Sequence, residues 1–125
     1  MLRACGRVLR RGGRIAYYTI FVAEELPARE RRRIGKDAPE GLYTHRGQQE
    51  ILKAAGFGRI RETDVTAEYL RVQRALYDAN ERHQRSLRRV LGDAKFDDAQ
   101  SSRKVTLACI ESGHYRRSLF VAERP

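Results

Sequence analysis

The sequence has few of the features that mark secreted or membrane-spanning proteins. Its two cysteines, Cys5 and Cys109, lie far apart and set no disulfide framework, so a reducing, cytoplasmic environment is expected. No run of 18 apolar residues is present, so no membrane-spanning helix is predicted. The basic N-terminus is not followed by the apolar stretch and cleavage site of a signal peptide. Cysteine and histidine also lack the close spacing of a zinc site, so no bound metal is expected.

Acidic residues are outnumbered, with 16 Asp and Glu against 26 Lys and Arg and a formal charge of +10. Such an excess suits phosphate-bearing partners, and also suits a protein whose arginines simply cover its solvated surface. The arginines are spread along the whole chain, and the tightest cluster, Arg29 to Arg33, is interrupted by Glu30. Spread of this kind favours the solvated surface, while a nucleic-acid contact stays possible.

The N-terminal residues predict a helix followed by a strand. Apolar residues recur at helical spacing, and a glycine pair, Gly12-Gly13, then supplies a left-handed stop. Ile15 to Val22 is the longest apolar run, with eight uncharged residues rich in β-branched and aromatic types. The run is too short for a membrane span and predicts a strand buried on both faces.

Residues 23–46 contain prolines, glycines and many charges, which predicts a long loop or lid with one helical turn at Pro27–Arg33. A helix capped by Thr44 is expected to run to Ala55 and to end at Gly56. The second strand then runs from Phe57 to Val65. Its alternation is imperfect, which places it near a sheet edge.

The next segment predicts helices. A single helix over about 67–91 would bury a stripe formed by Tyr69, Val72, Leu76, Ala79, His83, Leu87 and Val90. A further helix begins near Asp97 and presents Val105, Ala108 and Cys109. The third strand occupies 115–122. Because 67–112 is long for a crossover, it is interpreted as an inserted helical lid.

At 125 residues the chain is expected to be a single domain of the α/β class, α+β in appearance, with about three strands.

Four segments carry a resemblance to a known family. Val8-Leu9-Arg10-Arg11-Gly12-Gly13-Arg14-Ile15 resembles the segment before the fifth strand of class I S-adenosylmethionine-dependent methyltransferases, with Arg11 in place of the usual proline. Ile51 to Phe57 resembles their helix that ends in Ala-Gly-Phe, and Asp64-Val65-Thr66 resembles their Asp-x-Thr after the sixth strand. Gly113 to Ala122 resembles the seventh strand. No single motif is specific, but the four occur in the right order with suitable gaps.

The resemblance implies the C-terminal, substrate-side half of that domain: a partial Rossmann-like sheet of about three strands with an inserted helical lid. In this family a glycine-rich turn and a carboxylate hold S-adenosylmethionine. No such glycine turn occurs in the 125 residues. The resemblance therefore implies a truncated domain that binds no cofactor and is inactive alone, whereas the intact form would methylate a small molecule.

Candidate substrate-binding residues follow from the edge at which open α/β sheets bind ligands. Tyr18 and Phe21 lie at the C-terminal end of the first strand, although both also suit core packing. Tyr43 and His45 would line the same cleft from the loop. Tyr69 would line it from the lid, and His83 is the one plausible general base there. Asp64 is expected to cap a helix, or to face the cleft.

Two other functions stay open. The chain would be a non-enzymatic basic module if the arginine-rich long helix bound nucleic acid or an acidic protein. A partial sheet would also expose the edge of its first strand, so a homodimer or a complementing N-terminal half is expected to cover it.

Overall fold

The computed structural model describes all 125 residues. They form two compact units by internal contacts. Unit 1 contains Met1–Val65 and Arg116–Pro125, and unit 2 contains Thr66–Tyr115. The segment predicted as a helical insertion, 67–112, thus coincides closely with unit 2. None of the helices is both long and apolar enough to cross a membrane.

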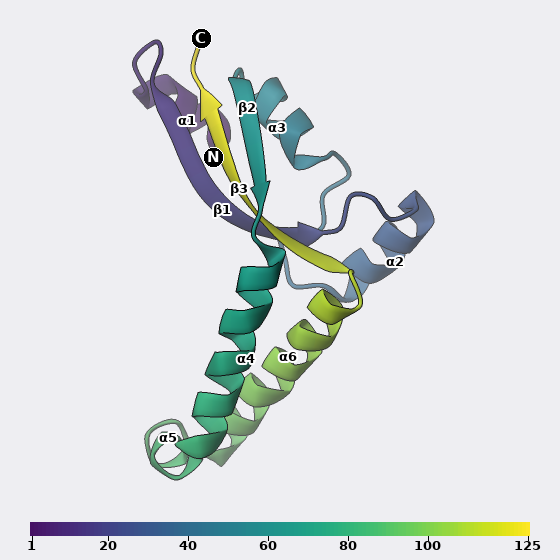
Figure 1. Cartoon of the computed structure of the whole chain (residues 1–125), viewed down its shortest axis with the longest axis vertical. Helices are drawn as coiled ribbons and strands as arrows, with labels where there is room; N and C mark the ends of the chain where they lie inside the picture. The colour runs from purple at the N-terminus through teal and green to yellow at the C-terminus, as the bar shows by residue number, and fades with distance from the viewer. The chain divides into compact units, whose positions relative to one another are not determined.

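Unit 1 holds all three strands and three short helices (Figure 1). In chain order these are α1 (Leu2–Val8), β1 (Arg14–Val22), α2 (Ala28–Asp37), α3 (Gln48–Ala54), β2 (Gly58–Asp64) and, after unit 2, β3 (Tyr115–Glu123). The strands predicted from the sequence are confirmed, with ends that differ by at most one residue.

The sheet has the strand order β1-β3-β2, so the last strand of the chain lies in the middle. β2 and β3 are antiparallel, with Thr63 opposite Leu119. At the start of β1, the Gly12 N–H donates to the Arg124 carbonyl at 2.7 Å and the Arg124 N–H donates to the Gly13 carbonyl at 2.8 Å. β3 therefore runs against both neighbours, and β1 and β2 are parallel to each other (Figure 1).

The core of unit 1 lies on one face of this sheet. Phe120 of β3 and Leu52 of α3 are fully buried, and Phe57 packs beside them. The Phe120 ring lies between Tyr17 and Phe21 of β1, with ring centroids at 5.7 and 6.2 Å. Helices α1 and α3 complete this core with half-buried side chains from Leu2, Cys5, Leu9 and Ala55.

The prediction that β1 is buried on both faces is wrong for most of its length. Burial alternates from Arg14 to Tyr18, and Ala16 and Tyr18 are exposed. Full burial is reached only at the end of the strand, from Phe21 to Ala23. The physical reason is that side chains alternate between the two faces of a strand, and the core of unit 1 contacts only one face of β1.

The segment 23–46 contains more helix than predicted. α2 is ten residues long, whereas the sequence suggested a single turn at Pro27–Arg33. Only Ile34 of this helix is buried. The chain then returns beside the end of β1, because the Val22 N–H donates to the Leu42 carbonyl at 2.9 Å.

Unit 2 consists of α4 (Thr66–Arg82), α5 (Gln84–Leu91) and α6 (Asp93–Glu111). The prediction of one helix over 67–91 is wrong, because the helix breaks at His83, whose φ of −104° and ψ of 17° are not helical. The expected buried stripe is also incorrect. Tyr69 is buried, but Val72 and Leu76 are about two-fifths exposed and Val90 is 83% exposed.

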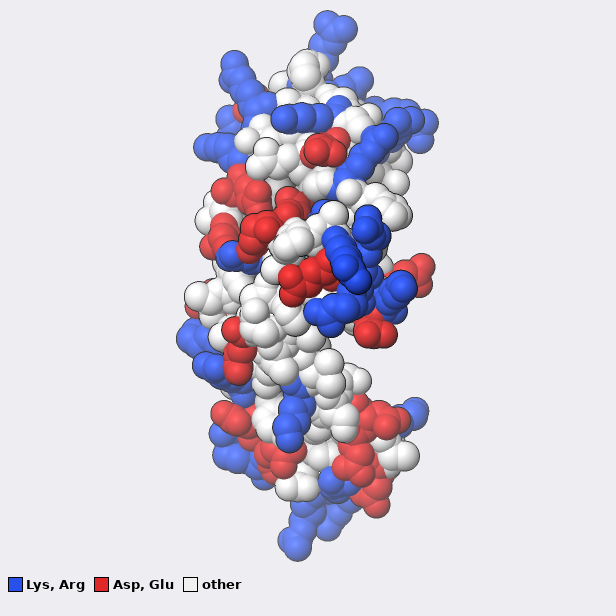
Figure 2. Space-filling model, turned by 90° about the vertical axis from the view of Figure 1, so that its right-hand side faces the viewer, with Lys and Arg blue, Asp and Glu red and all other residues white.

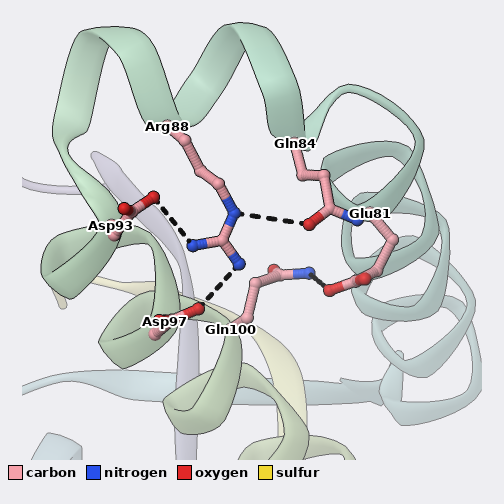
Figure 3. A network of polar contacts seen from close by, with 6 residues as sticks. All are labelled: Glu81, Gln84, Arg88, Asp93, Asp97 and Gln100. Carbon is pink, nitrogen blue, oxygen red and sulfur yellow. Dashed lines mark hydrogen bonds and ion pairs between the residues drawn. The ribbon is translucent and has the colours of Figure 1, made fainter.

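Polar side chains join the helices of unit 2. Gln100 of α6 is buried, and its amide donates to the Tyr77 carbonyl at 3.2 Å. The same amide donates to Glu81 at 2.9 Å (Figure 3). Arg88 of α5 donates to Asp97 at 2.8 Å and to Asp93 at 3.1 Å, with its guanidinium over the Phe96 ring. These bonds tie α4 and α5 to α6.

Candidate functional site

The C-terminal ends of the parallel strands β1 and β2 lie at the same edge of the sheet. Open α/β sheets bind ligands beyond this edge, because the loops that follow the strands enclose a crevice there. In unit 1 the edge is formed by the residues after Val22, by Asp64, by the start of β3 and by the loop that joins α2 to α3. Of the predicted site residues in unit 1, Phe21, Tyr43, His45 and Asp64 lie at this edge, whereas Tyr18 lies near the middle of β1.

An arginine closes this edge between the two strands. Arg116 of β3 donates from Nε to Glu25 at 2.7 Å and from Nη1 to Asp64 at 2.7 Å. The hydrogen bond to Glu25 is the main cause that raises the pKa of Arg116, and its charge attraction to both carboxylates adds to it. Asp64, expected as a helix cap or a cleft residue, thus pairs with Arg116 across the sheet.

A second carboxylate fixes the loop to the start of α3. Glu24 accepts a hydrogen bond of 2.6 Å from the Gln48 N–H. A Cβ atom on Gly47 would lie only 3.2 Å from the Glu24 carboxylate, so glycine permits this close approach. The end of β1 and the beginning of α3 are thereby held together.

The loop brings Tyr43 and His45 into contact. Their predicted role, lining the substrate cleft, stays a prediction. The Tyr43 hydroxyl and His45 Nδ1 are 3.4 Å apart, and the two rings meet edge to face at 5.4 Å. Arg31 of α2 lies over the Tyr43 ring at 5.8 Å and donates to the Thr44 carbonyl at 3.2 Å. The Tyr43 ring occupies the space where a side chain at Gly35 would lie.

We call these three residues the loop cluster: Arg31, Tyr43 and His45. The cluster combines a guanidinium, a hydroxyl and an imidazole. The Nε atom of Arg31 is buried and has no hydrogen-bond partner. A hydroxyl and a cation beside an imidazole can bind an anionic or hydroxylated group and can exchange a proton with it. Sequence reasoning missed Arg31, because it belongs to the run Arg29–Arg33 that was interpreted as a solvated surface.

Tyr18 and Phe21, the two candidates on β1, lie on opposite faces of the strand. Phe21 is part of the core beside Phe120. Tyr18 is 55% exposed on the other face, where the guanidinium of Arg117 lies 4.5 Å from its ring centroid. Only Tyr18 therefore has an accessible side chain, and its role in substrate binding stays a prediction.

Tyr69 and His83, the candidates on the predicted lid, belong to unit 2. Tyr69 is buried near the start of α4. His83 is exposed at the break between α4 and α5, and its backbone continues the hydrogen bonding of both helices. Their proposed roles as lid lining and general base stay predictions.

Glycines with positive φ were compared with the turn that would hold S-adenosylmethionine. They are Gly12, Gly41, Gly56, Gly92 and Gly113, with φ between 76 and 92°. Four of them follow helices and the fifth lies in the loop after α2, so none joins the carboxyl end of a strand to a helix. None of these five glycines therefore lies at the place of the predicted cofactor-binding turn.

Known proteins were compared by sequence and by structure. No family model and no curated protein matches the sequence. The structure matches phosphoethanolamine N-methyltransferase 2 of Haemonchus contortus, solved with S-adenosyl-L-methionine, at 18% identity and a TM-score of 0.78, covering 99% of this chain and 29% of that one. The same enzyme has been solved with phosphomonomethylethanolamine and S-adenosylhomocysteine.

Two cyclopropane synthases give similar matches. One, from Mycobacterium tuberculosis, is 13% identical with a TM-score of 0.72, covering 98% of this chain and 48% of that one. The other, a mycolic acid cyclopropane synthase, is 15% identical with a TM-score of 0.81, covering 98% and 50%. The chain thus spans half or less of each of these solved structures. The matches confirm the predicted fold, that of part of a class I methyltransferase.

Proposed function

We propose that these residues form the substrate-side part of an S-adenosylmethionine-dependent methyltransferase that acts on a small molecule. The observation that carries the proposal is the structural match, which extends over both units to enzymes of this fold.

The loop cluster supports the substrate side of this proposal. Tyr43 and His45 would bind and orient a polar group of the substrate, and Arg31 would favour a negatively charged one. In the tautomer in which the Nδ1–H of His45 donates to the Tyr43 hydroxyl, Nε2 has the free lone pair and would accept a proton from the substrate. Binding in one orientation is the main contribution such residues make to a group transfer.

The cofactor would be held by residues outside these 125; the support for this is that no glycine with positive φ lies between the end of a strand and a helix. The outer edges of β1 and β2 are the edges of the sheet, and a further strand would pair there. A complementing N-terminal half or a second copy of the chain would supply it. A monomer by light scattering, with cooperative unfolding, would contradict the expectation that a second strand-bearing partner covers β1.

A pair of titrations tests the two halves of the proposal separately. S-Adenosylhomocysteine should give no heat in calorimetry with the chain alone, and tight binding would contradict the assignment of the cofactor site to other residues. Phosphoethanolamine, added to a ¹⁵N-labelled sample, should shift the amides of residues 42–46, whereas ethanolamine should not.

The variants for this titration are Tyr43→Phe and His45→Ala, each with Tyr77→Phe in unit 2 as the matched control. Loss of the shifts in the loop variants and not in the control is expected. Equal shifts in all of them would refute a role of the loop cluster in substrate binding.

Binding of nucleic acid or an acidic protein by the long helix has less support. Arg71, Arg74 and Arg88 pair with carboxylates of their own unit, which leaves fewer free cations than the sequence suggested. Steep loss of DNA binding with salt, measured by fluorescence anisotropy, would revive this alternative.

A further inference from the structure

A cationic cleft lies at the sheet edge opposite the loop cluster. Its volume is about 230 Å³, and it is lined by Arg3, Gly6, Arg7, Ala55, Gly56, Phe57 and Arg124. Phe57 directly precedes β2 and Arg124 directly follows β3, which places the cleft at the N-terminal edge of β1 and β2. It is therefore separate from the proposed substrate site.

Three arginines line this cleft without a carboxylate among the lining residues. Arg3 and Arg7 form no ion pair, and the guanidinium of Arg124 donates only to the Leu9 carbonyl. The nearby Arg14 and Arg59, in contrast, both pair with Glu123. In Figure 2 the uppermost part of unit 1 shows more Lys and Arg than Asp and Glu.

The arrangement favours an anion in the cleft. Arg3 and Arg7 are one helical turn apart on α1, and like charges at this spacing repel each other. A phosphate group between them would replace this repulsion with charge-assisted hydrogen bonds, for which the guanidinium is well suited. Gly6 lies against Phe57 in this lining, since a Cβ atom on Gly6 would be 3.7 Å from the Phe57 ring.

An apolar groove continues from the cleft. It has a volume of about 470 Å³ and shares Arg3 and Ala55 with the cleft; its other lining residues include Leu2, Ile51, Ala54 and, as a further cation, Arg46. Apolar side chains thus lie next to unpaired guanidinium groups. A ligand that used both would need a negatively charged head and a hydrocarbon part.

We propose that this edge of unit 1 binds an amphiphile that consists of a phosphate monoester and an alkyl chain. The phosphate lies between Arg3, Arg7 and Arg124, and the alkyl chain lies along Ile51 and Ala54. The proposal is independent of methyl transfer, because it uses none of the residues of the loop cluster.

Calorimetric titration with decyl phosphate, kept below its micelle concentration, tests the proposal. Decyl phosphate should bind, whereas inorganic phosphate and decanol should each bind at least roughly ten-fold more weakly, a difference of about 1.4 kcal/mol. Equal affinity for inorganic phosphate would overturn the role of the groove. Absence of decyl phosphate binding would overturn the whole proposal.

The variant Arg3→Gln/Arg7→Gln should lose decyl phosphate binding. Its matched control is Arg29→Gln/Arg32→Gln, which removes the same charge from the exposed face of α2, where neither arginine has an ion-pair partner. Equal loss in both variants would indicate attraction by net charge alone and would contradict a specific site. Circular dichroism of each variant checks that the fold is retained.

A vesicle assay distinguishes a free amphiphile from a membrane. Binding to phosphatidic acid vesicles without binding to monomeric decyl phosphate would overturn the proposal in favour of a membrane surface. Ile51→Asn supplies an uncharged test of the groove: it should weaken decyl phosphate binding and leave the weak binding of inorganic phosphate unchanged.

Discussion

Unit 1 and unit 2 are stabilised by different kinds of contact. Unit 1 buries a continuous apolar cluster around Phe120 on one face of its sheet. Unit 2 has few buried side chains, one of them the amide of Gln100, and exposes Val72, Leu76, Val90 and Val105. Its helices are joined by hydrogen bonds and ion pairs of Arg74, Arg88 and Gln100.

This difference has a consequence for stability. Apolar burial contributes roughly 25 cal/mol per Å², whereas an exposed ion pair contributes about 0–1 kcal/mol. Unit 2 should therefore open more readily than unit 1, and its amides should exchange with solvent faster. Four substitutions test the contrast, beginning with the one that should have the largest effect.

Phe120→Ala should destabilise unit 1 most. The ring is fully buried between Tyr17 and Phe21, so its removal should cost about 3–5 kcal/mol. Urea unfolding followed by hydrogen exchange of β1 and β3 measures the loss. Tyr18→Ala, which truncates an exposed ring on the same sheet, is the control; a similar cost for both would mean that the core does not dominate.

Gly35→Ala should disturb the loop cluster next. The added Cβ would lie 2.5 Å from Cγ of Tyr43, so the ring must move, at a cost of about 1–3 kcal/mol. NMR of the His45 ring should show that its contact with Tyr43 is lost. Lys36→Ala, on the adjacent exposed position, should leave that contact in place; an unchanged His45 signal in Gly35→Ala would refute the tight fit.

Tyr17→Phe should stabilise unit 1 slightly. The Tyr17 hydroxyl is buried without a hydrogen-bond partner, so its removal should raise the free energy of unfolding by up to about 1 kcal/mol.

Burial also raises the pKa of Tyr17. Because the folded chain then holds this proton more tightly, stability should fall as pH rises above about 10, the pKa of an unfolded tyrosine. Thermal unfolding at neutral and alkaline pH should show both effects, and a loss of stability in Tyr17→Phe would reveal a partner for the hydroxyl.

Arg88→Gln should have the smallest effect, and one that depends on salt. It removes the bonds to Asp93 and Asp97, so the amides of α5 should exchange faster at low salt. High salt should reduce the difference in α5 exchange rates between the variant and the unaltered chain, because salt screens the ion pairs. Arg85→Gln, at an exposed position without an ion pair, is the control. A difference that high salt leaves unchanged would show that Arg88 acts through packing on Phe96 instead.

The sequence predicted the strands and the helices α1 and α3 well, because their signals are local. The expected Thr44 cap of α3 is wrong: the helix begins at Gln48 with Gly47 as its N-cap, and the Thr44 hydroxyl donates to the Arg46 carbonyl instead. Gly12-Gly13 and Gly56 mark helix ends, and the apolar run of β1 has no helical period. α2 was underestimated because only Ile34 is buried and the other positions are charged or small. Helix propensity without an apolar stripe gives little signal.

Unit 2 was predicted less well, because its contacts are polar. Gln100 is buried where a pattern of apolar residues predicts exposure, and Val105 is 62% exposed where the pattern predicts burial. The break between α4 and α5 at His83 has no glycine or proline near it, so the sequence contains no signal that predicts it. In the loop cluster, Tyr43 and His45 were predicted together, but Arg31 comes from a different element, and spacing along one sequence cannot show that it lies near them.

The central place of β3 sets the order in which the chain can fold during synthesis. β1 is translated about a hundred residues before β3, its hydrogen-bonding partner, and unit 2 is made between them. Pairings this far apart in the chain form slowly. A ribosome that pauses before residue 115 would therefore hold a helical unit 2 and two strands that still lack β3, and these are the strands that a chaperone would have to protect.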